Sequence, residues 1–255
     1  MVTEGLSVKG VLFGKGKPKI CVPIVERNKE TILSYAEKVL ELHPDMIEIR
    51  VDWFEGVNQV ESVMALLRDL RMVIGDTLLM MTIRTKNEGG EFEGSIEDYR
   101  TLCVRGCESG WIDLIDVEAF MDDELPGDII KVAHQCDVYV VASNHDFEKT
   151  PDEQEIVRRL KYMDEQGADL PKVAVMPNSE RDVLTLLSAT LRYREQGGKK
   201  PIITMSMDAM GLVSRLIGEL TGSAVTFATA GRVSAPGQIH MKDMQPILEV
   251  MHFDR

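Results

Sequence analysis

Several signals that would assign the chain to a well-known class of protein are absent from its sequence. Its four cysteines include no Cys-x-x-Cys pair; they are Cys21, Cys103, Cys107 and Cys136. Cys103 and Cys107 would share a helix face, but no histidine lies nearby to complete a metal site. No run approaches the ~18 apolar residues that a membrane span needs, and residues 1–5 lack the basic and then apolar pattern of a signal peptide. These absences predict a soluble, cytoplasmic protein with buried, reduced thiols.

Positive charge is also scarce. The chain has 29 lysines and arginines against 42 aspartates and glutamates, which gives a formal net charge of −13. This balance argues against nucleic acid or an anionic membrane surface as the main partner, since both attract basic surfaces. It leaves an anionic small molecule open as a substrate, because a few arginines can make one pocket locally positive. With 255 residues, 44% of them hydrophobic, the chain can bury a sizeable core in one large domain or two small ones.

Short apolar runs alternate with amphipathic stretches along the chain. The runs expected to be strands are 19–23, 46–51, 77–83, 111–117, 138–143, 172–176, 201–206 and 224–227. The stretches expected to be helices include 29–42, 57–72, 95–108, 152–166, 179–194, 210–220 and 237–251. Eight βα units predict an α/β protein with a (β/α)₈ barrel, which we expect to be a single domain over residues 1–255. A doubly wound open sheet is the alternative, but the Gly-rich turn that usually follows its first strand is missing.

The segment before the first predicted strand alternates weakly between apolar and polar residues over 6–13. We expect residues 1–18 to form a short hairpin that closes the bottom of the barrel, at the amino-terminal ends of its strands.

Strand alternation places a group of polar side chains inside the predicted barrel. In the run 46–51, Ile47 and Ile49 alternate with Glu48 and Arg50, and the apolar face should meet the helices. An edge strand in another fold would also alternate, with its charges in water, but the repeated βα units favour the barrel. The same alternation turns inward Asp52, Thr82, Arg84, Asp116, Ser143, His145, Lys172, Ala174 and Met176. Most of these polar groups arrive near the carboxyl ends of five consecutive strands, where barrel active sites lie.

Lys172 and His145 stand out among the inward residues. Lys172 begins a run of Val, Ala and Met, where an amine is costly to bury unless it is used or paired. A lysine attacks a carbonyl only as its free amine, and apolar surroundings favour that uncharged form. The protonated imine that follows acidifies the adjacent carbon, and His145 can then move a proton near neutral pH. A carboxylate bonded to the imidazole would fix its tautomer, and Glu88, in the loop 86–90, is a candidate.

A simpler interpretation of each polar residue is also open. A lone histidine at a strand end is often structural, whereas a lysine within an apolar strand is rarer and favours a functional role. His134 and His252 have no comparable setting and are expected at the surface. Arg105, Arg158 and Arg159 fall on predicted helix faces and are expected to be solvated.

Six motifs, in order along nearly the whole chain, resemble those of the type I 3-dehydroquinate dehydratase family. They are Glu-Ile-Arg-Val-Asp at 48–52, Thr-Ile-Arg at 82–84 with Glu-Gly-Gly at 88–90, Ser-Asn-His-Asp-Phe at 143–147, Pro-Lys-Val-Ala-Val-Met-Pro at 171–177, Thr-Met-Ser-Met at 204–207 with Ser214 and Arg215, and Ser-Ala-Pro-Gly-Gln at 234–238. Six motifs in this order, on the expected elements of a barrel, make the resemblance specific.

The resemblance implies dehydration of 3-dehydroquinate to 3-dehydroshikimate through a lysine imine, a step of the shikimate pathway to aromatic amino acids, without a metal or cofactor. It also implies that Lys172 forms the Schiff base, that His145 removes the C2 proton and helps release the C1 hydroxyl as water, and that Glu88 orients His145. The residues that it implies around the substrate are Glu48, Arg50 and Arg84 for ring hydroxyls, Met207 and Phe227 as walls, and Arg215, Ser234 and Gln238 at the carboxylate. A homodimer, and a loop at 234–238 that folds over the substrate, are implied as well.

Three positions depart from the family pattern, and two other functions stay open. Asp208 stands where the family usually has glycine, Val233 where alanine is common, and Pro23 where some members have a substrate-contacting serine. None of these departures removes a catalytic group. Another class I Schiff-base barrel lyase, such as an aldolase, often needs a phosphate site near the last two strands, where this chain has no Gly-rich turn. A degenerate barrel that only binds a ligand is the non-enzymatic alternative.

Overall fold

The computed structural model describes residues 5–253, so residues 1–4 of the predicted hairpin segment lie outside the described residues. Eight parallel strands form one sheet, in the order β10-β3-β4-β5-β6-β7-β8-β9. Their bounds are β3 Lys19–Ile24, β4 Met46–Arg50, β5 Leu78–Thr82, β6 Leu114–Glu118, β7 Tyr139–Asp146, β8 Lys172–Val175, β9 Ile203–Ser206 and β10 Val225–Phe227. The backbone N–H of Ala224 donates to Ile202 O at 2.7 Å and joins the two end strands. The predicted (β/α)₈ barrel is therefore confirmed.

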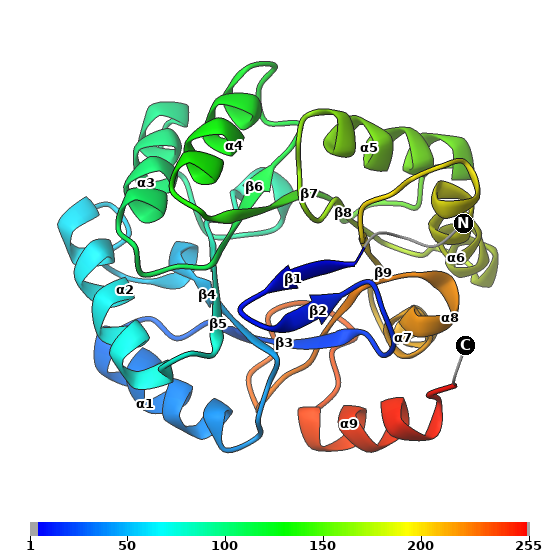
Figure 1. The fold of residues 1–255 in the computed structure, drawn as a ribbon, viewed down its shortest axis with the longest axis horizontal. Coiled ribbons are helices and arrows are strands. Elements are labelled where there is room, and N and C mark those ends of the chain that lie inside the picture. The colour runs from blue at the N-terminus through cyan, green and yellow to red at the C-terminus, as the bar shows by residue number, and fades with distance from the viewer. Residues whose placement is uncertain (1–4, 254–255) are drawn as a thin grey trace.

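Helices surround the ring of strands (Figure 1). They are α1 Lys29–Leu40, α2 Val60–Ile74, α3 Ile96–Glu108, α4 Leu125–Gln135, α5 Glu153–Glu165, α6 Glu180–Glu195, α7 Leu212–Leu216, α8 Gly218–Thr221 and α9 Met241–Val250, with short 3₁₀ turns η1 Val51–Trp53 and η2 Lys86–Glu88. Ile47 and Ile49 pack in one buried cluster with Leu66 and Leu70 of α2. The predicted assignment of the isoleucine face of β4 to the helices is thus confirmed. None of the helices within residues 5–253 is long and apolar enough to span a membrane.

The helix predictions differ from the structure in three places. Helix α4 was not among the predicted stretches. The predicted helix 210–220 is divided into α7 and α8 at Gly218, where a Cβ would lie only 2.7 Å from Ser223 O and 3.2 Å from Pro18 Cγ. This close approach needs glycine and interrupts the helix. The last helix starts at Met241 instead of residue 237, because residues 237–240 belong to the loop that crosses the barrel mouth and His240 caps α9.

The amino-terminal segment forms the predicted hairpin across the bottom of the barrel (Figure 1). Strands β1 Leu6–Val8 and β2 Val11–Phe13 pair in antiparallel fashion around Lys9 and Gly10, which both have positive φ, as a tight hairpin turn requires. The side chains of Val8 and Phe13 are buried in one cluster with Met46, at the start of β4. Lys9 Nζ also contacts Asp113 Oδ1, just before β6, at 2.6 Å. The hairpin therefore seals the amino-terminal end of the barrel interior.

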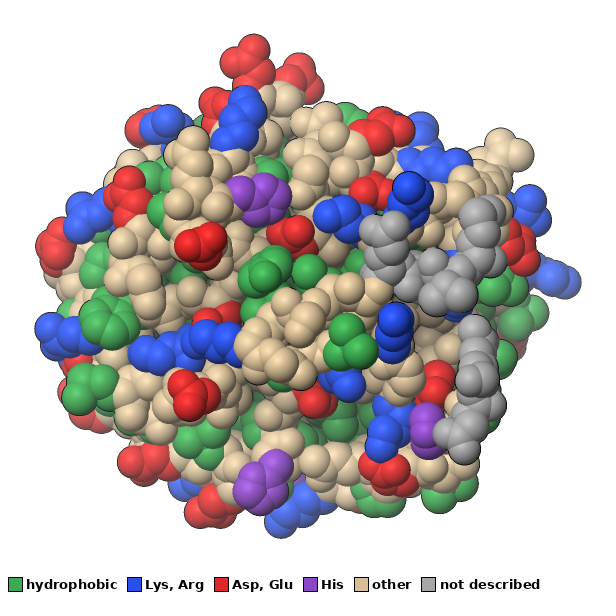
Figure 2. Space-filling view, in the orientation of Figure 1, with side chains coloured by type: hydrophobic (Ala, Val, Ile, Leu, Met, Phe, Trp, Pro, Cys, Tyr) green, Lys and Arg blue, Asp and Glu red, His purple; other side chains and the backbone are tan. Residues whose placement is uncertain are grey.

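Charges of both signs are interspersed over the face that carries the hairpin, and the described residues on it form no continuous basic surface (Figure 2). All four cysteines are free; Cys21, Cys103 and Cys107 are buried and Cys136 is half-buried. The prediction of free and largely buried thiols is therefore confirmed in the described part of the chain.

Replacement of Phe13 by alanine should destabilise the protein by about 3–5 kcal/mol, because its side chain is completely buried under the barrel floor and would leave a cavity. Leu12, the preceding residue on β2, is 38% exposed, and Leu12→Ala should change stability by less than about 0.5 kcal/mol. Urea unfolding of the two variants measures the difference. Equal small effects would show that the hairpin is not packed into the barrel.

Candidate active site

One pocket at the open end of the barrel brings together all eleven residues that the sequence predicted. It is lined by Glu48, Arg50, Arg84, Glu88, His145, Lys172, Met207, Arg215, Phe227, Ser234 and Gln238, together with Gly89, Phe147, Ala174, Met205 and Ala235. These residues come from five strands, β4, β7, β8, β9 and β10, and from the segments that follow β5, β7, β9 and β10. The parallel barrel explains the convergence, because the carboxyl ends of all eight strands meet around one mouth.

The stagger of the strands places Lys172 within this pocket although it is the first residue of β8. Lys172 pairs in register with Ser143 of β7, and Ser143 pairs in turn with Glu118, the last residue of β6. Lys172 therefore stands level with the carboxyl end of β6. Its side chain is only 5% exposed, and its Nζ lies 3.0 Å from Asp116 Oδ2 and 4.8 Å from the centre of the Phe227 ring. The ion pair and the aromatic face offset the cost of burying the amine.

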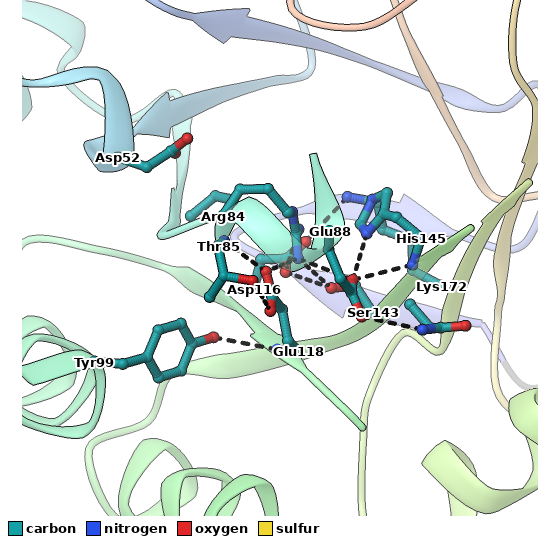
Figure 3. A network of polar contacts seen from close by, with 12 residues as sticks. Asp52, Arg84, Thr85, Glu88, Tyr99, Asp116, Glu118, Ser143, His145 and Lys172 are labelled. Carbon is teal, nitrogen blue, oxygen red and sulfur yellow. Dashed lines mark hydrogen bonds and ion pairs between the residues drawn. The ribbon is translucent and has the colours of Figure 1, made fainter. Parts of the chain in front are cut away.

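Asp116 holds three neighbours at once (Figure 3). Its Oδ1 accepts hydrogen bonds from Arg84 Nη2 and Ser143 Oγ, both at 2.6 Å, while Oδ2 faces Lys172. Burial alone would raise the pKa of the Asp116 carboxyl, but the positive charges of Arg84 and Lys172 hold it well below its usual range. Asp116 is therefore an ionised carboxylate in the barrel interior.

His145 and Glu88 form the pair that the sequence predicted. His145 Nδ1 lies 2.8 Å from Glu88 Oε2, which also accepts the backbone N–H of His145 at 3.0 Å. Asn144 Nδ2 donates to the other oxygen of Glu88 at 3.0 Å. The turn that carries Glu88 back to β7 depends on Gly90, where a Cβ would lie 2.1 Å from Arg84 O. The ring of Phe147 is stacked beside the His145 imidazole, with 6.4 Å between the ring centres.

Burial of the pair favours the uncharged forms of both partners. Burial raises the pKa of Glu88 to about 7. Burial and the positive charges of Arg84 and Lys172 lower the pKa of His145 well below its ordinary value of 6.5. The imidazole is thus neutral near pH 7, and we assign its Nδ1 as the donor to Glu88. The lone pair of Nε2 is then available to accept a proton in the pocket.

Arg84 connects the two halves of the site. Besides Asp116, its guanidinium bonds Glu118 Oε1 at 3.0 Å and approaches Glu88 Oε2 at 3.6 Å. Glu118 is fixed in turn by the backbone N–H and hydroxyl of Thr85, at 2.8 and 2.7 Å. Arg84 therefore lies between the carboxylate beside Lys172 and the carboxylate beside His145.

The other predicted polar residues at the floor of the pocket have partners within the protein. Arg50 makes two parallel hydrogen bonds to Asp52, at 2.9 and 2.8 Å, and Glu48 accepts the hydroxyl of Thr82 at 2.7 Å. Glu48 and Arg50 are both less than 10% exposed. Their positions are thus fixed before any ligand arrives.

Arg215 differs from the other buried cations of the pocket. It is 2% exposed, and no carboxylate within residues 5–253 forms an ion pair with it. Its Nη2 donates to Pro236 O at 2.9 Å, Nη1 lies 3.6 Å from Met205 Sδ, and Nε has no hydrogen-bond partner. Burial lowers the pKa of Arg215 to about 10. A buried guanidinium without a counter-ion is a site for an anion.

The loop that contains Ser234 and Gln238 covers this guanidinium. Ser234 N donates to Gln238 Oε1 at 2.9 Å, and Gln238 Nε2 donates to Ser234 Oγ at 3.0 Å. At the amino-terminal side of the loop, Arg232 Nη1 forms an ion pair with Glu26 Oε2 at 2.9 Å. At its carboxyl-terminal side, Gly237 packs so closely on Asp208 that a Cβ would lie 2.3 Å from Asp208 O. The loop is thus held over the mouth from both sides.

The structure accounts for two of the three departures from the family pattern. Asp208 has φ +60°, a left-handed conformation that glycine adopts without strain and aspartate tolerates better than most residues. Val233 is 57% exposed, so its larger side chain meets no steric conflict. Pro23 is buried in β3, opposite Glu48 in register.

Several residues of the site were missed or misjudged from the sequence. Asp116 was placed inside the barrel without a role. Glu118, two residues further along β6, was missed although the same alternation points it inward. Arg159 was predicted to be solvated, which is wrong, because it is 20% exposed and donates to Asn144 Oδ1 at 2.8 Å. The surface positions predicted for His134, His252, Arg105 and Arg158 are confirmed.

The fold and site together define a (β/α)₈ barrel with a buried lysine beside a histidine–carboxylate pair, the class of barrel in which an amine can act as a nucleophile. The model of the type I 3-dehydroquinase family matches residues 20–255. The chain belongs to this family.

Relatives named 3-dehydroquinate dehydratase match nearly the whole chain. The 3-dehydroquinate dehydratase of Clostridioides difficile (strain 630) is 48% identical over 97% of both chains, and that of Bacillus subtilis (strain 168) is 45% identical over the same shares. Among solved structures, a type I 3-dehydroquinate dehydratase from Clostridium difficile with covalently modified comenic acid superimposes with a TM-score of 0.95, at 47% identity and 98% of both chains. The structure of the 3-dehydroquinate dehydratase of Geobacillus kaustophilus superimposes with a TM-score of 0.94, at 36% identity over 98% of this chain and 97% of that chain.

The pKa of the His145 imidazole should lie well below 6.5 when it is measured by ¹⁵N NMR titration, because burial and two nearby cations disfavour its charged form. In Lys172→Met one of these cations is lost, so the pKa of His145 should rise. A pKa at or above 6.5 in the unaltered protein would contradict the neutral imidazole assigned here.

Proposed function

We propose that this protein dehydrates 3-dehydroquinate to 3-dehydroshikimate, the step of the shikimate pathway that the curated relatives are named for, through a Schiff base on Lys172. The observation that carries the proposal is the constellation of a buried lysine and a neutral histidine, bonded to Glu88, on the wall of one pocket. The covalently modified ligand named for the C. difficile structure supports covalent chemistry in this fold. The proposed reaction calls for no metal or cofactor.

In the proposed mechanism the amine of Lys172 attacks the ketone of the substrate and forms an imine, with loss of water. The protonated imine nitrogen withdraws electrons from the neighbouring carbon and acidifies its proton. Nε2 of His145 removes this C2 proton, and the resulting imidazolium then donates a proton to the leaving C1 hydroxyl. Glu88 holds Nδ1 of the imidazole throughout, which keeps Nε2 directed at the substrate and stabilises the imidazolium.

The remaining predicted residues bind the substrate in this proposal. The carboxylate of the substrate pairs with Arg215, which has no carboxylate partner among the described residues, and Ser234 and Gln238 close over it. Glu48, Arg50 and Arg84 contact ring hydroxyls, and the apolar side chains of Met207 and Phe227 enclose the ring. We further propose that the chain works as one barrel domain over residues 1–255, in the cytoplasm and as a homodimer.

Replacement of Lys172 by alanine should abolish turnover of 3-dehydroquinate, because the imine cannot form without the amine. The change should leave a folded protein, since Asp116 keeps its hydrogen bonds from Arg84 and Ser143. Formation of the conjugated product, followed by its ultraviolet absorbance, measures the rate. Lys199→Ala, at an exposed lysine, is the matched control and should keep wild-type turnover. Near-wild-type activity of Lys172→Ala would refute the mechanism, and cleavage of phosphorylated sugars by the unaltered protein would support the aldolase alternative.

Replacement of His145 by alanine should lower kcat by about 10²–10⁴-fold, the usual loss when a general acid–base group is removed. Imine formation should survive, because the amine of Lys172 remains. His134→Ala removes a histidine whose side chain is 43% exposed and serves as the control. An unchanged kcat in His145→Ala would assign the proton transfer to another group.

A further inference from the structure

The proposed mechanism gives no task to the carboxylate that lies nearest to the reacting nitrogen. Asp116 is 1% exposed and lies 3.0 Å from Lys172 Nζ. Within residues 5–253, no other carboxylate forms an ion pair with this amine. An ionised carboxylate at this depth is costly to bury, so its retention beside the nucleophile calls for an explanation.

The orientation of the Asp116 carboxylate is fixed by its surroundings. One oxygen, Oδ1, is shared by Arg84 and Ser143, both at 2.6 Å, which leaves Oδ2 directed at Lys172 (Figure 3). The backbone pairing of Lys172 with Ser143 maintains the same spacing. A negative charge is thus presented at a fixed place beside the lysine nitrogen, whatever that nitrogen is bonded to.

We propose that Asp116 is the counter-ion of the protonated imine, which keeps the imine nitrogen on Lys172 charged while His145 transfers the proton. The inference rests on the proposed function and adds a catalytic residue to it. In a buried site that is poorly screened by water, a fixed opposite charge favours the charged form of its neighbour strongly.

The charges of the reaction are consistent with one permanent counter-ion. The resting ammonium and a ketone give an iminium and one water: the nitrogen loses two protons, which leave with the carbonyl oxygen, and it keeps one proton and its positive charge. Removal of the C2 proton sends an electron pair to this nitrogen and makes it neutral. Expulsion of the C1 hydroxyl, protonated by His145, restores the iminium. The nitrogen is therefore positive before the C2 proton is removed and again after the C1 hydroxyl leaves, and Asp116 faces a cation in both of these states; the nitrogen is neutral only in the enamine between them.

The other carboxylates around the site have partners of their own. Glu88 is bonded to His145, Glu118 to Arg84 and Thr85, and Glu48 to Thr82. The titratable and charged groups that face Lys172 and Asp116 are Cys21 from β3, Glu48 and Arg50 from β4, Arg84 and Glu88 from the segment after β5, Glu118 from β6, His145 from β7 and Arg215 from α7. Within residues 5–253, only one carboxylate, that of Asp116, forms an ion pair with Lys172 Nζ. The depressed pKa of Asp116 keeps it ionised across the working pH range.

The pH profile of kcat in Asp116→Asn tests this role, because kcat reports groups in the enzyme–substrate complex. Without the carboxylate, the imine should lose its proton at lower pH and cease to act as an electron sink. The alkaline limb of the kcat profile should move down by about 1–3 pH units, the usual effect of one close charge. The rate loss should therefore be small near pH 6 and at least about tenfold at pH 8.5.

Glu118→Gln is the matched control, since it also removes a carboxylate from Arg84 but none from Lys172. Its alkaline limb should stay at the wild-type position. An equal loss of rate at every pH in Asp116→Asn, or the same shift in Glu118→Gln, would overturn the proposal.

Binding of 3-dehydroshikimate to each variant checks that the pocket is intact. If Asp116→Asn does not bind 3-dehydroshikimate, the kcat profile of Asp116→Glu tests the proposal, because this variant keeps the negative charge. A lower rate with the alkaline limb at its wild-type position would support the requirement for a charge. A displaced alkaline limb would contradict the proposal. Absence of turnover in the unaltered protein at all pH values would instead refute the proposed function, so the two failures are distinguishable.

Discussion

The pairing of buried charges is the constraint on which the rest of this site depends. Lys172, Arg84 and Arg50 are all nearly inaccessible to water inside the barrel, and each is tolerated there because a carboxylate lies within 3 Å. Asp116 supplies two of these pairings, so the positions of Lys172 and of Arg84 are set by one side chain. Removal of one partner from such a network leaves the other charge buried without compensation, which is far more costly than the pair itself.

The same constraint identifies the group that awaits a ligand. Arg215 is as deeply buried as Arg84, but its hydrogen bond goes to a backbone carbonyl of the covering loop instead of a carboxylate. Among the described residues, the pocket thus contains one buried cation without a carboxylate partner, Arg215, although the chain has a net charge of −13. In the proposed function an anionic substrate completes the charge balance, with the loop that carries Ser234 and Gln238 over its carboxylate.

Local sequence pattern was enough to predict the barrel, the hairpin and the inward face of the strands. Alternation of Ile47 and Ile49 with Glu48 and Arg50 has only one arrangement in a sheet covered by helices. The pattern could not predict which inward groups pair, because Asp116 and Lys172 are 56 positions apart and the strand stagger decides their contact. The break at Gly218 and the start of α9 were also beyond reach, since both depend on contacts with distant segments.

The central claim, that Lys172 is the nucleophile, is tested most directly by mass spectrometry of the protein after incubation with 3-dehydroquinate and sodium borohydride. The reduced imine cannot hydrolyse, so the account predicts one stable adduct, mapped by proteolysis to the peptide that contains Lys172. An adduct on a different lysine, or no adduct from folded protein that turns over the substrate, would contradict it.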